Sequence, residues 1–137
     1  MKKIDKGTIG RLEYIGLPEF KLKKVVAKID TGAYNGSIHA GDIEEKDGKL
    51  YFRLLDGKVG PKTRRRVVKD FKQKRIKSSH GKSVKRYVIN TDIVLKGEKI
   101  NVDLSLSNRD GLRYPVLLGR KIFKKHFIVD ASKKFTK

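Results

Sequence analysis

The sequence lacks several residue types on which particular chemistries depend. None of the 137 residues is cysteine, which excludes a disulfide framework, a thiolate zinc site and a thiol nucleophile. No apolar run approaches the ~18 residues of a membrane-spanning helix, and residues 1–6, Met-Lys-Lys-Ile-Asp-Lys, are not followed by the apolar stretch of a signal peptide. These absences predict a soluble, cytoplasmic protein that does not associate with membranes.

Motifs for metal or nucleotide binding are also missing. Neither His-Glu-x-x-His nor Gly-x-x-x-x-Gly-Lys-Ser/Thr occurs in the chain. The three histidines, His39, His80 and His126, are scattered rather than spaced as ligands. A metal site built from these histidines and carboxylates is the alternative, but we expect no metal and no other cofactor.

Acidic residues are scarce, so the chain is strongly basic. Fifteen Asp and Glu stand against 35 Lys and Arg, a formal net charge of +20. Residues 58–86 hold thirteen of the basic residues and one acid, Asp70, which places +12 in this segment. Such a field attracts an anionic partner, whether nucleic acid, an acidic membrane surface or an acidic polypeptide. The alternative is a solvated surface loop. Phe71 is the only Phe or Tyr in the segment, which disfavours nucleic acid because such modules stack bases on aromatic side chains.

Hydrophobic residues alternate with polar ones with the period of β-strands. Turn signals stand at Asp47-Gly48 and at Lys96-Gly97-Glu98. We predict one mostly β domain over residues 1–137, barrel-like or sandwich-like, with a basic insertion at about 57–75. Strands are expected at 8–15, 22–29, 49–55, 84–95, 99–106 and 127–129, and a short helix at 120–125.

Three segments suggest a functional site, although each has a plain structural interpretation. Asp30-Thr31-Gly32-Ala33 follows an apolar strand and, taken alone, would be an ordinary turn. Residues 76–84 place small residues between two β-rich arms, as in a surface hairpin. Residues 114–120, Tyr-Pro-Val-Leu-Leu-Gly-Arg, could be a buried strand that ends at a glycine.

In this order, the three segments resemble the retropepsins, which are homodimeric aspartic peptidases. The resemblance is closer to the bacterial and archaeal retropepsin-like family often labelled "ATP-dependent zinc protease", and it covers roughly residues 8–130. It implies an all-β, closed barrel-like retropepsin (acid protease) fold with one short C-terminal helix. The residues that carry it are Asp30, Thr31, Gly32, Ala33, Ser37, His39, Ala40, Lys77, Ser78, Ser79, Gly81 and the run from Arg113 to Arg120.

The resemblance also implies roles for these residues. Asp30 would share one proton with Asp30 of a second copy, because two carboxylates ~3 Å apart cannot both ionise. Thr31 would fix the geometry across the dimer, and Gly32 would let the backbone approach the substrate. Substrate binding would fall to Ala33, Arg113 and a mobile flap carrying Lys77, Ser78, Ser79, His80 and Gly81. Ser37, His39, Leu118, Gly119 and Arg120 would support the site structurally.

Two departures separate the chain from the retroviral enzymes. Those enzymes carry an Asp after Asp-Thr-Gly-Ala that pairs with the Arg of Gly-Arg, whereas this chain has Tyr34, which leaves Arg120 without an assigned partner. The stretch between Asp30 and the flap is also longer. The strands near residues 8–15 and 126–130 are expected at the dimer interface, because unpaired strand edges invite pairing.

The resemblance implies an acidic substrate, since the family is linked to ATP-grasp ligases that add glutamates to protein C-termini. We therefore expect an aspartic endopeptidase that trims glutamate-rich tails, with such a ligase as a possible partner. Two alternatives remain: a non-catalytic member of the fold that binds anionic protein or scaffolds a ligase, and a nucleic-acid or ribosome-binding β domain. Candidate anchors for an acidic tail are Arg64, Arg65, Arg66, Lys77, Arg86 and Arg113.

Overall fold

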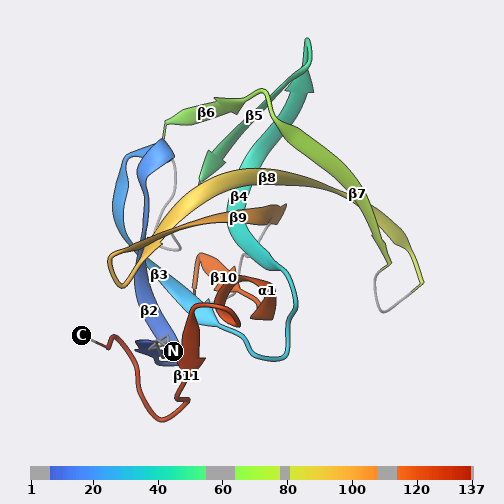
Figure 1. Ribbon diagram of the computed structural model, residues 1–137. Coiled ribbons are helices and arrows are strands. Elements are labelled where there is room, and N and C mark those ends of the chain that lie inside the picture. The colour runs from blue at the N-terminus through green and yellow to red at the C-terminus, as the bar shows by residue number, and fades with distance from the viewer. Residues whose placement is uncertain (1–6, 55–63, 78–80, 108–113, 137) are drawn as a thin grey trace, which may run out of the picture.

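The computed structural model describes residues 7–54, 64–77, 81–107 and 114–136 (Figure 1). Its centre is a closed six-stranded barrel. β10 closes the ring because it pairs in parallel with β3 on one side and antiparallel with β4 on the other. Around the barrel the strands are β2 (Leu12–Leu17), β3 (Leu22–Ile29), β10 (Val116–Leu118), β4 (Gly36–Lys46), β9 (Glu98–Ser107) and β8 (Ser83–Leu95).

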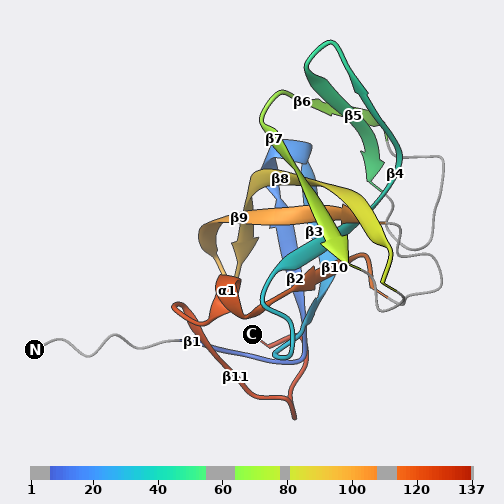
Figure 2. The same ribbon diagram turned by 90° about the vertical axis from the view of Figure 1, so that its right-hand side faces the viewer.

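Three further strands, β5, β6 and β7, extend the walls of this barrel. The second half of β4 leaves the wall to pair with β5 (Lys49–Leu54), which pairs with β6 (Arg65–Val68), and β7 (Phe71–Lys77) forms a hairpin with β8. β5 and β6 lie at one end of the molecule, whereas β10 and the helix α1 (Arg120–Phe123) lie toward the other in both views (Figures 1 and 2). The predicted all-β, closed barrel with one short C-terminal helix is confirmed.

The barrel encloses an apolar core that follows the alternation of the sequence. On β9, Ile100, Val102, Leu104 and Leu106 are all at most 6% exposed, while the residues between them point outward. Burying an aliphatic side chain of this size stabilises the fold by about 1.5–3 kcal/mol. No helix in the described part of the chain is long and apolar enough to cross a membrane.

The prediction of one N-terminal strand over residues 8–15 is wrong, because the structure has two strands there. The chain bends at Gly10 and Arg11, so that β1 (Gly7–Ile9) pairs with β11 (Phe127–Val129) and β2 starts at Leu12. The C-terminal segment crosses the chain at this bend. A Cβ on Gly10 would lie 2.3 Å from the carbonyl oxygen of Lys133, so only glycine leaves room for the crossing.

Other boundaries differ less. The helix ends at Phe123 rather than residue 125, and a 3-10 turn, η1 (Pro18–Phe20), connects β2 to β3. β4 was not expected, because charged residues and a register shift between Gly41 and Glu44 interrupt its alternation. The basic insertion was predicted at about residues 57–75. Its second half contains β6 and the first part of β7, whereas residues 57–63 lie outside the described part of the chain.

Candidate active site

Asp30 stands at the carboxyl end of β3, next to the end of β10. Its backbone N–H donates to the carbonyl oxygen of Leu118 at 2.9 Å, which extends the parallel β3–β10 pairing by one residue. The side chain is half-buried, and its Oδ1 accepts the N–H of Gly32 at 2.9 Å. Ala33 N–H closes the turn on the carbonyl oxygen of Asp30 at 3.2 Å. The loop therefore holds the carboxylate in one orientation.

Gly32 contributes space to this turn. A Cβ on Gly32 would lie 3.3 Å from Oδ1 of Asp30, a closer approach than side chains usually make. Thr31 and Gly32 are both exposed, so the loop presents its polar groups outward. A carboxylate held in this way is open to a second carboxylate or to a peptide.

The start of α1 fixes the far side of the same loop. Arg120 N–H donates to the carbonyl oxygen of Ala33 at 2.7 Å, and Lys121 N–H donates to that of Tyr34 at 3.0 Å. Gly119 makes this approach possible, because a Cβ there would lie 2.5 Å from the carbonyl oxygens of Tyr34 and Asn35. The side chain of Leu118 is fully buried. Leu118, Gly119 and Arg120 are thus brought against the Asp30 loop.

The Arg120 side chain finds partners that the sequence alone did not suggest. Its guanidinium donates to the carbonyl oxygen of Thr31 at 3.0 Å, and its Cζ lies 5.8 Å from the centre of the Tyr34 ring. Lys124 Nζ lies 5.7 Å from the same ring, which is 47% exposed. A backbone carbonyl and an aromatic face are thus the contacts of Arg120, whose partner the sequence left unassigned. A cation over an exposed ring is worth about 0.5–1 kcal/mol.

Ser37 and His39 lie in the barrel wall. Ser37 is in register with Leu117 on β10 and with Ser105 on β9. His39 is 5% exposed; its backbone N–H donates to Pro115 at 2.7 Å, and its ring Nδ1 lies 3.5 Å from the carbonyl oxygen of Ser107. Both residues therefore connect β4 to neighbouring strands.

The hairpin that would form the flap is built from β7 and β8, which project from the barrel (Figure 1). Lys77 and Ser83 are the last paired residues of the hairpin. Gly81 lies between them in the turn, with a φ of +81°, which glycine adopts freely. The predicted residues Ser78, Ser79, His80 and Arg113 lie outside the described part of the chain.

Of the other candidate anchors, Arg86 donates to the Ser107 hydroxyl at 3.1 Å. Arg65 and Arg66 belong to β6, and Arg64 directly precedes it, at the end of the molecule remote from β10 (Figures 1 and 2). These three arginines are therefore not part of the Asp30 loop. Among the described residues, no three His, Asp or Glu side chains are grouped as metal ligands.

Curated relatives match almost the whole chain but exceed it in length. A protein of Desulfotalea psychrophila named "Probable alpha-L-glutamate ligase" is 34% identical over 134 residues, which are 94% of this chain and 29% of the relative. A protein of Shewanella pealeana with the same name is also 34% identical, over 96% of this chain and 30% of the relative. The chain spans less than a third of the length of these curated relatives.

A solved structure and a family model match at the chain's own length. The structure of a Legionella pneumophila protein of unknown function is 30% identical and superimposes with a TM-score of 0.72, covering 96% of this chain and 98% of that one. A family model described as "Retropepsin-like aspartic endopeptidase RimB" matches residues 8–137, which include the Asp30 loop, the β7–β8 hairpin and the Gly119-Arg120 turn. The chain belongs to this RimB-like family of retropepsin-like aspartic endopeptidases.

Proposed function

We propose that the protein is an aspartic endopeptidase whose active unit is a homodimer with one Asp30 from each copy. The observation that carries the proposal is the Asp30 loop, in which Gly32 orients the carboxylate and β10 holds the backbone. The sequence contains one Asp-Thr-Gly, so a second carboxylate of the same kind has to come from a second chain. A two-fold axis places the same loop of both chains together.

The chemistry of such a pair needs only the two carboxylates and water. The ionised Asp30 takes a proton from the water, and the water oxygen attacks the scissile carbonyl carbon. The protonated Asp30 of the other chain donates its proton to the carbonyl oxygen. The tetrahedral intermediate then breaks its C–N bond as a proton moves to the leaving nitrogen. In this proposal, Thr31 and Gly32 position the carboxylates, and no covalent intermediate forms.

We propose a glutamate-rich tail as the substrate. A net charge of +20 favours an acidic peptide, and the relatives' names indicate bond formation to glutamate, the reverse of hydrolysis. Ala33 would line the cleft, together with Arg113 and with the flap residues from Lys77 to Gly81. A glutamate ligase is accordingly the partner that we propose.

The test compares the wild type with Asp30→Asn on a glutamate-tailed peptide, with products read by mass spectrometry. Asparagine keeps an oxygen that can accept the Gly32 N–H, so the loop should persist while cleavage is lost. Asp42→Asn is the matched control, because Asp42 sits on the β4–β5 hairpin with a φ of +50°, which asparagine tolerates. Equal cleavage by the wild type and Asp30→Asn would refute the proposal.

Mixing the two chains tests the dimer. If both carboxylates belong to one site, activity should fall in proportion to the heterodimer that forms with Asp30→Asn. A fully active mixed dimer, or a monomer that cleaves at full rate, would contradict the shared site.

A second candidate function is a non-catalytic module for binding acidic protein. It is favoured by the relatives, in which a region like this chain is under a third of a longer protein named as a ligase. In that case the wild type and Asp30→Asn would bind the peptide equally and neither would cleave it.

A further inference from the structure

A groove lies at the end of β3 opposite to Asp30. It has a volume of about 570 Å³ and mainly apolar walls, formed by Gly16, Pro18, Leu22 and Val94, with Lys21 and Lys23 at its rim. Both lysines are exposed. Lys21 is held in place by the 3-10 turn, since its N–H donates to Pro18 at 3.1 Å and its φ is +56°.

The groove is separate from the Asp30 loop. Asp30 follows Lys23 by seven positions along the extended strand, and at ~3.3 Å per residue this separation is about 23 Å. A ligand in the groove therefore does not touch the carboxylate. Any effect of the groove on binding is separable from the chemistry at Asp30.

Another cation contacts the 3-10 turn that carries Lys21. Arg66 lies with its Cζ 5.9 Å from the ring of Phe20, the residue before Lys21, and its Nε is buried without a hydrogen-bond partner. Burial and the neighbouring Arg64 lower the pKa of the Arg66 guanidinium.

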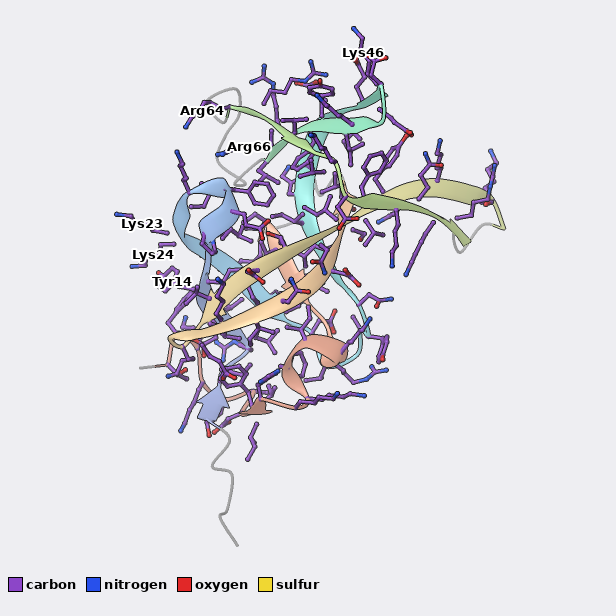
Figure 3. The ribbon with its side chains drawn as sticks, turned by 45° about the horizontal axis from the view of Figure 1, so that its top comes forward. Tyr14, Lys23, Lys24, Lys46, Arg64 and Arg66 are labelled. Atoms are coloured by element: carbon purple, nitrogen blue, oxygen red, sulfur yellow. The ribbon has the colours of Figure 1, made fainter. Side chains whose placement is uncertain are left out.

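More cations continue along the same side of the molecule. Figure 3 shows Lys23 and Lys24 beside β3, near Tyr14, and Arg64 and Arg66 beyond the β2–β3 turn. Lys24 is held over the Tyr14 ring at 4.2 Å. One carboxylate, Glu19, belongs to the same turn and accepts the Thr91 hydroxyl at 3.1 Å. The surface around the groove is thus positive overall.

We propose that this groove is a docking site for an acidic polypeptide segment that carries an apolar side chain. The apolar walls would take the side chain, while Lys21 and Lys23 pair with carboxylates. Nucleic acid fits less well, because the described residues here offer little for bases to stack on: Phe20 is buried, and the Tyr14 ring already contacts Lys24 and stacks on Phe135 at 4.4 Å.

Fluorescence anisotropy on the full chain carrying Asp30→Asn tests the proposal. The probes are a labelled peptide of eight glutamates around one leucine, the same peptide with serine for leucine, and an eight-nucleotide oligouridylate. The test variant is Lys21→Gln/Lys23→Gln. The control is Lys46→Gln/Lys49→Gln, which removes the same charge from the β4–β5 hairpin.

We expect the test variant to weaken binding of the leucine peptide by about tenfold, and the control by less than twofold. The serine peptide should bind the parent more weakly than the leucine peptide. Equal losses in both variants, an indifference to leucine, tighter binding of oligouridylate, or no binding of any probe would each overturn the proposal.

A cleavage assay separates this site from the proposed function. In a chain that retains Asp30, Lys21→Gln/Lys23→Gln should cleave a four-residue glutamate peptide at the parent's rate, because so short a peptide cannot reach the groove. Loss of that cleavage in the double variant would overturn the separation of the two sites. Binding of the leucine peptide without cleavage by the parent would tell against the proposed function alone.

Discussion

Gly119→Ala should damage the candidate site although it adds a single methyl group. The backbone at Gly119 is extended, with φ −93° and ψ 176°, so alanine could adopt it without strain. The obstacle is space, because the new Cβ would lie 2.5 Å from the carbonyl oxygens of Tyr34 and Asn35. These are backbone atoms, which cannot rotate away as the end of a side chain can.

The size of the effect follows from the displacement. Relief of the clash to an ordinary contact of 3.4 Å requires the chains to separate by 0.9 Å (3.4 − 2.5). Overpacking of this kind costs about 1–3 kcal/mol, and a loss of the Arg120–Ala33 backbone hydrogen bond adds about 1 kcal/mol. We expect a free energy of unfolding lower by about 3 kcal/mol. A displacement near 1 Å beside the carboxylate should also slow cleavage by about a hundredfold.

Urea denaturation followed by circular dichroism measures the stability, and mass spectrometry of the glutamate-tailed peptide measures the activity. Gly7→Ala is the control, since a Cβ at Gly7 would meet its neighbours at 3.6 Å or more. The reasoning is refuted if Gly119→Ala is as stable as Gly7→Ala and cleaves at the parent's rate.

Three further predictions concern stability, pH and metal. Glu13 is 2% exposed and accepts hydrogen bonds from Gly10 N–H and from the N–H and hydroxyl of Thr136. Glu13→Gln should therefore lower the free energy of unfolding, measured by urea denaturation, by about 1–3 kcal/mol. The control Glu44→Gln, at an exposed residue, should leave it unchanged. Hydrogen bonds from Ser132 lower the pKa of Asp130 below 3.8. Its stabilisation is therefore complete above that value and lost as pH falls through the lower folded-state pKa. Thermal melts from roughly pH 2 to 5 should show a shallower acid loss for Asp130→Asn. Cleavage should survive a strong chelator and removal of nucleotide, because two carboxylates suffice; a loss on chelation that zinc restores would contradict this.

The fold was predictable where pairing follows local pattern. The alternation over 99–106 and the turn at Lys96-Gly97 place β8 and β9 antiparallel, as the structure has them. The closure of the barrel was not predictable from periodicity, because β10 is three residues long and pairs with strands more than seventy positions away. β4 was missed since its outer half is exposed on the extension formed with β5 and β6, where its side chains do not alternate between core and solvent.

The candidate site divides in the same way. The turn of Asp30 onto Gly32 is local, so residue types and spacing sufficed to suggest it. The partners of Arg120 depend on how α1 meets the loop, and a backbone carbonyl as acceptor leaves no mark in the sequence. Glu13 is hidden for a related reason, because its burial is created by Thr136, the residue 123 positions along the chain that folds back onto it.

The terminal strands change what a dimer would require. β1 and β11 pair in parallel within one chain, and the C-terminal segment adds backbone hydrogen bonds to Ile9, Arg11 and Leu12. A homodimer formed through these strands would therefore join the outer edges of two complete sheets, where Ile128 is 58% exposed. Two chains that each carry a net charge of +20 repel each other, so salt should favour this association because it screens the repulsion. The same screening weakens the attraction of an acidic peptide. Salt therefore acts with opposite sign on the assembly of the proposed active unit and on the capture of its proposed substrate.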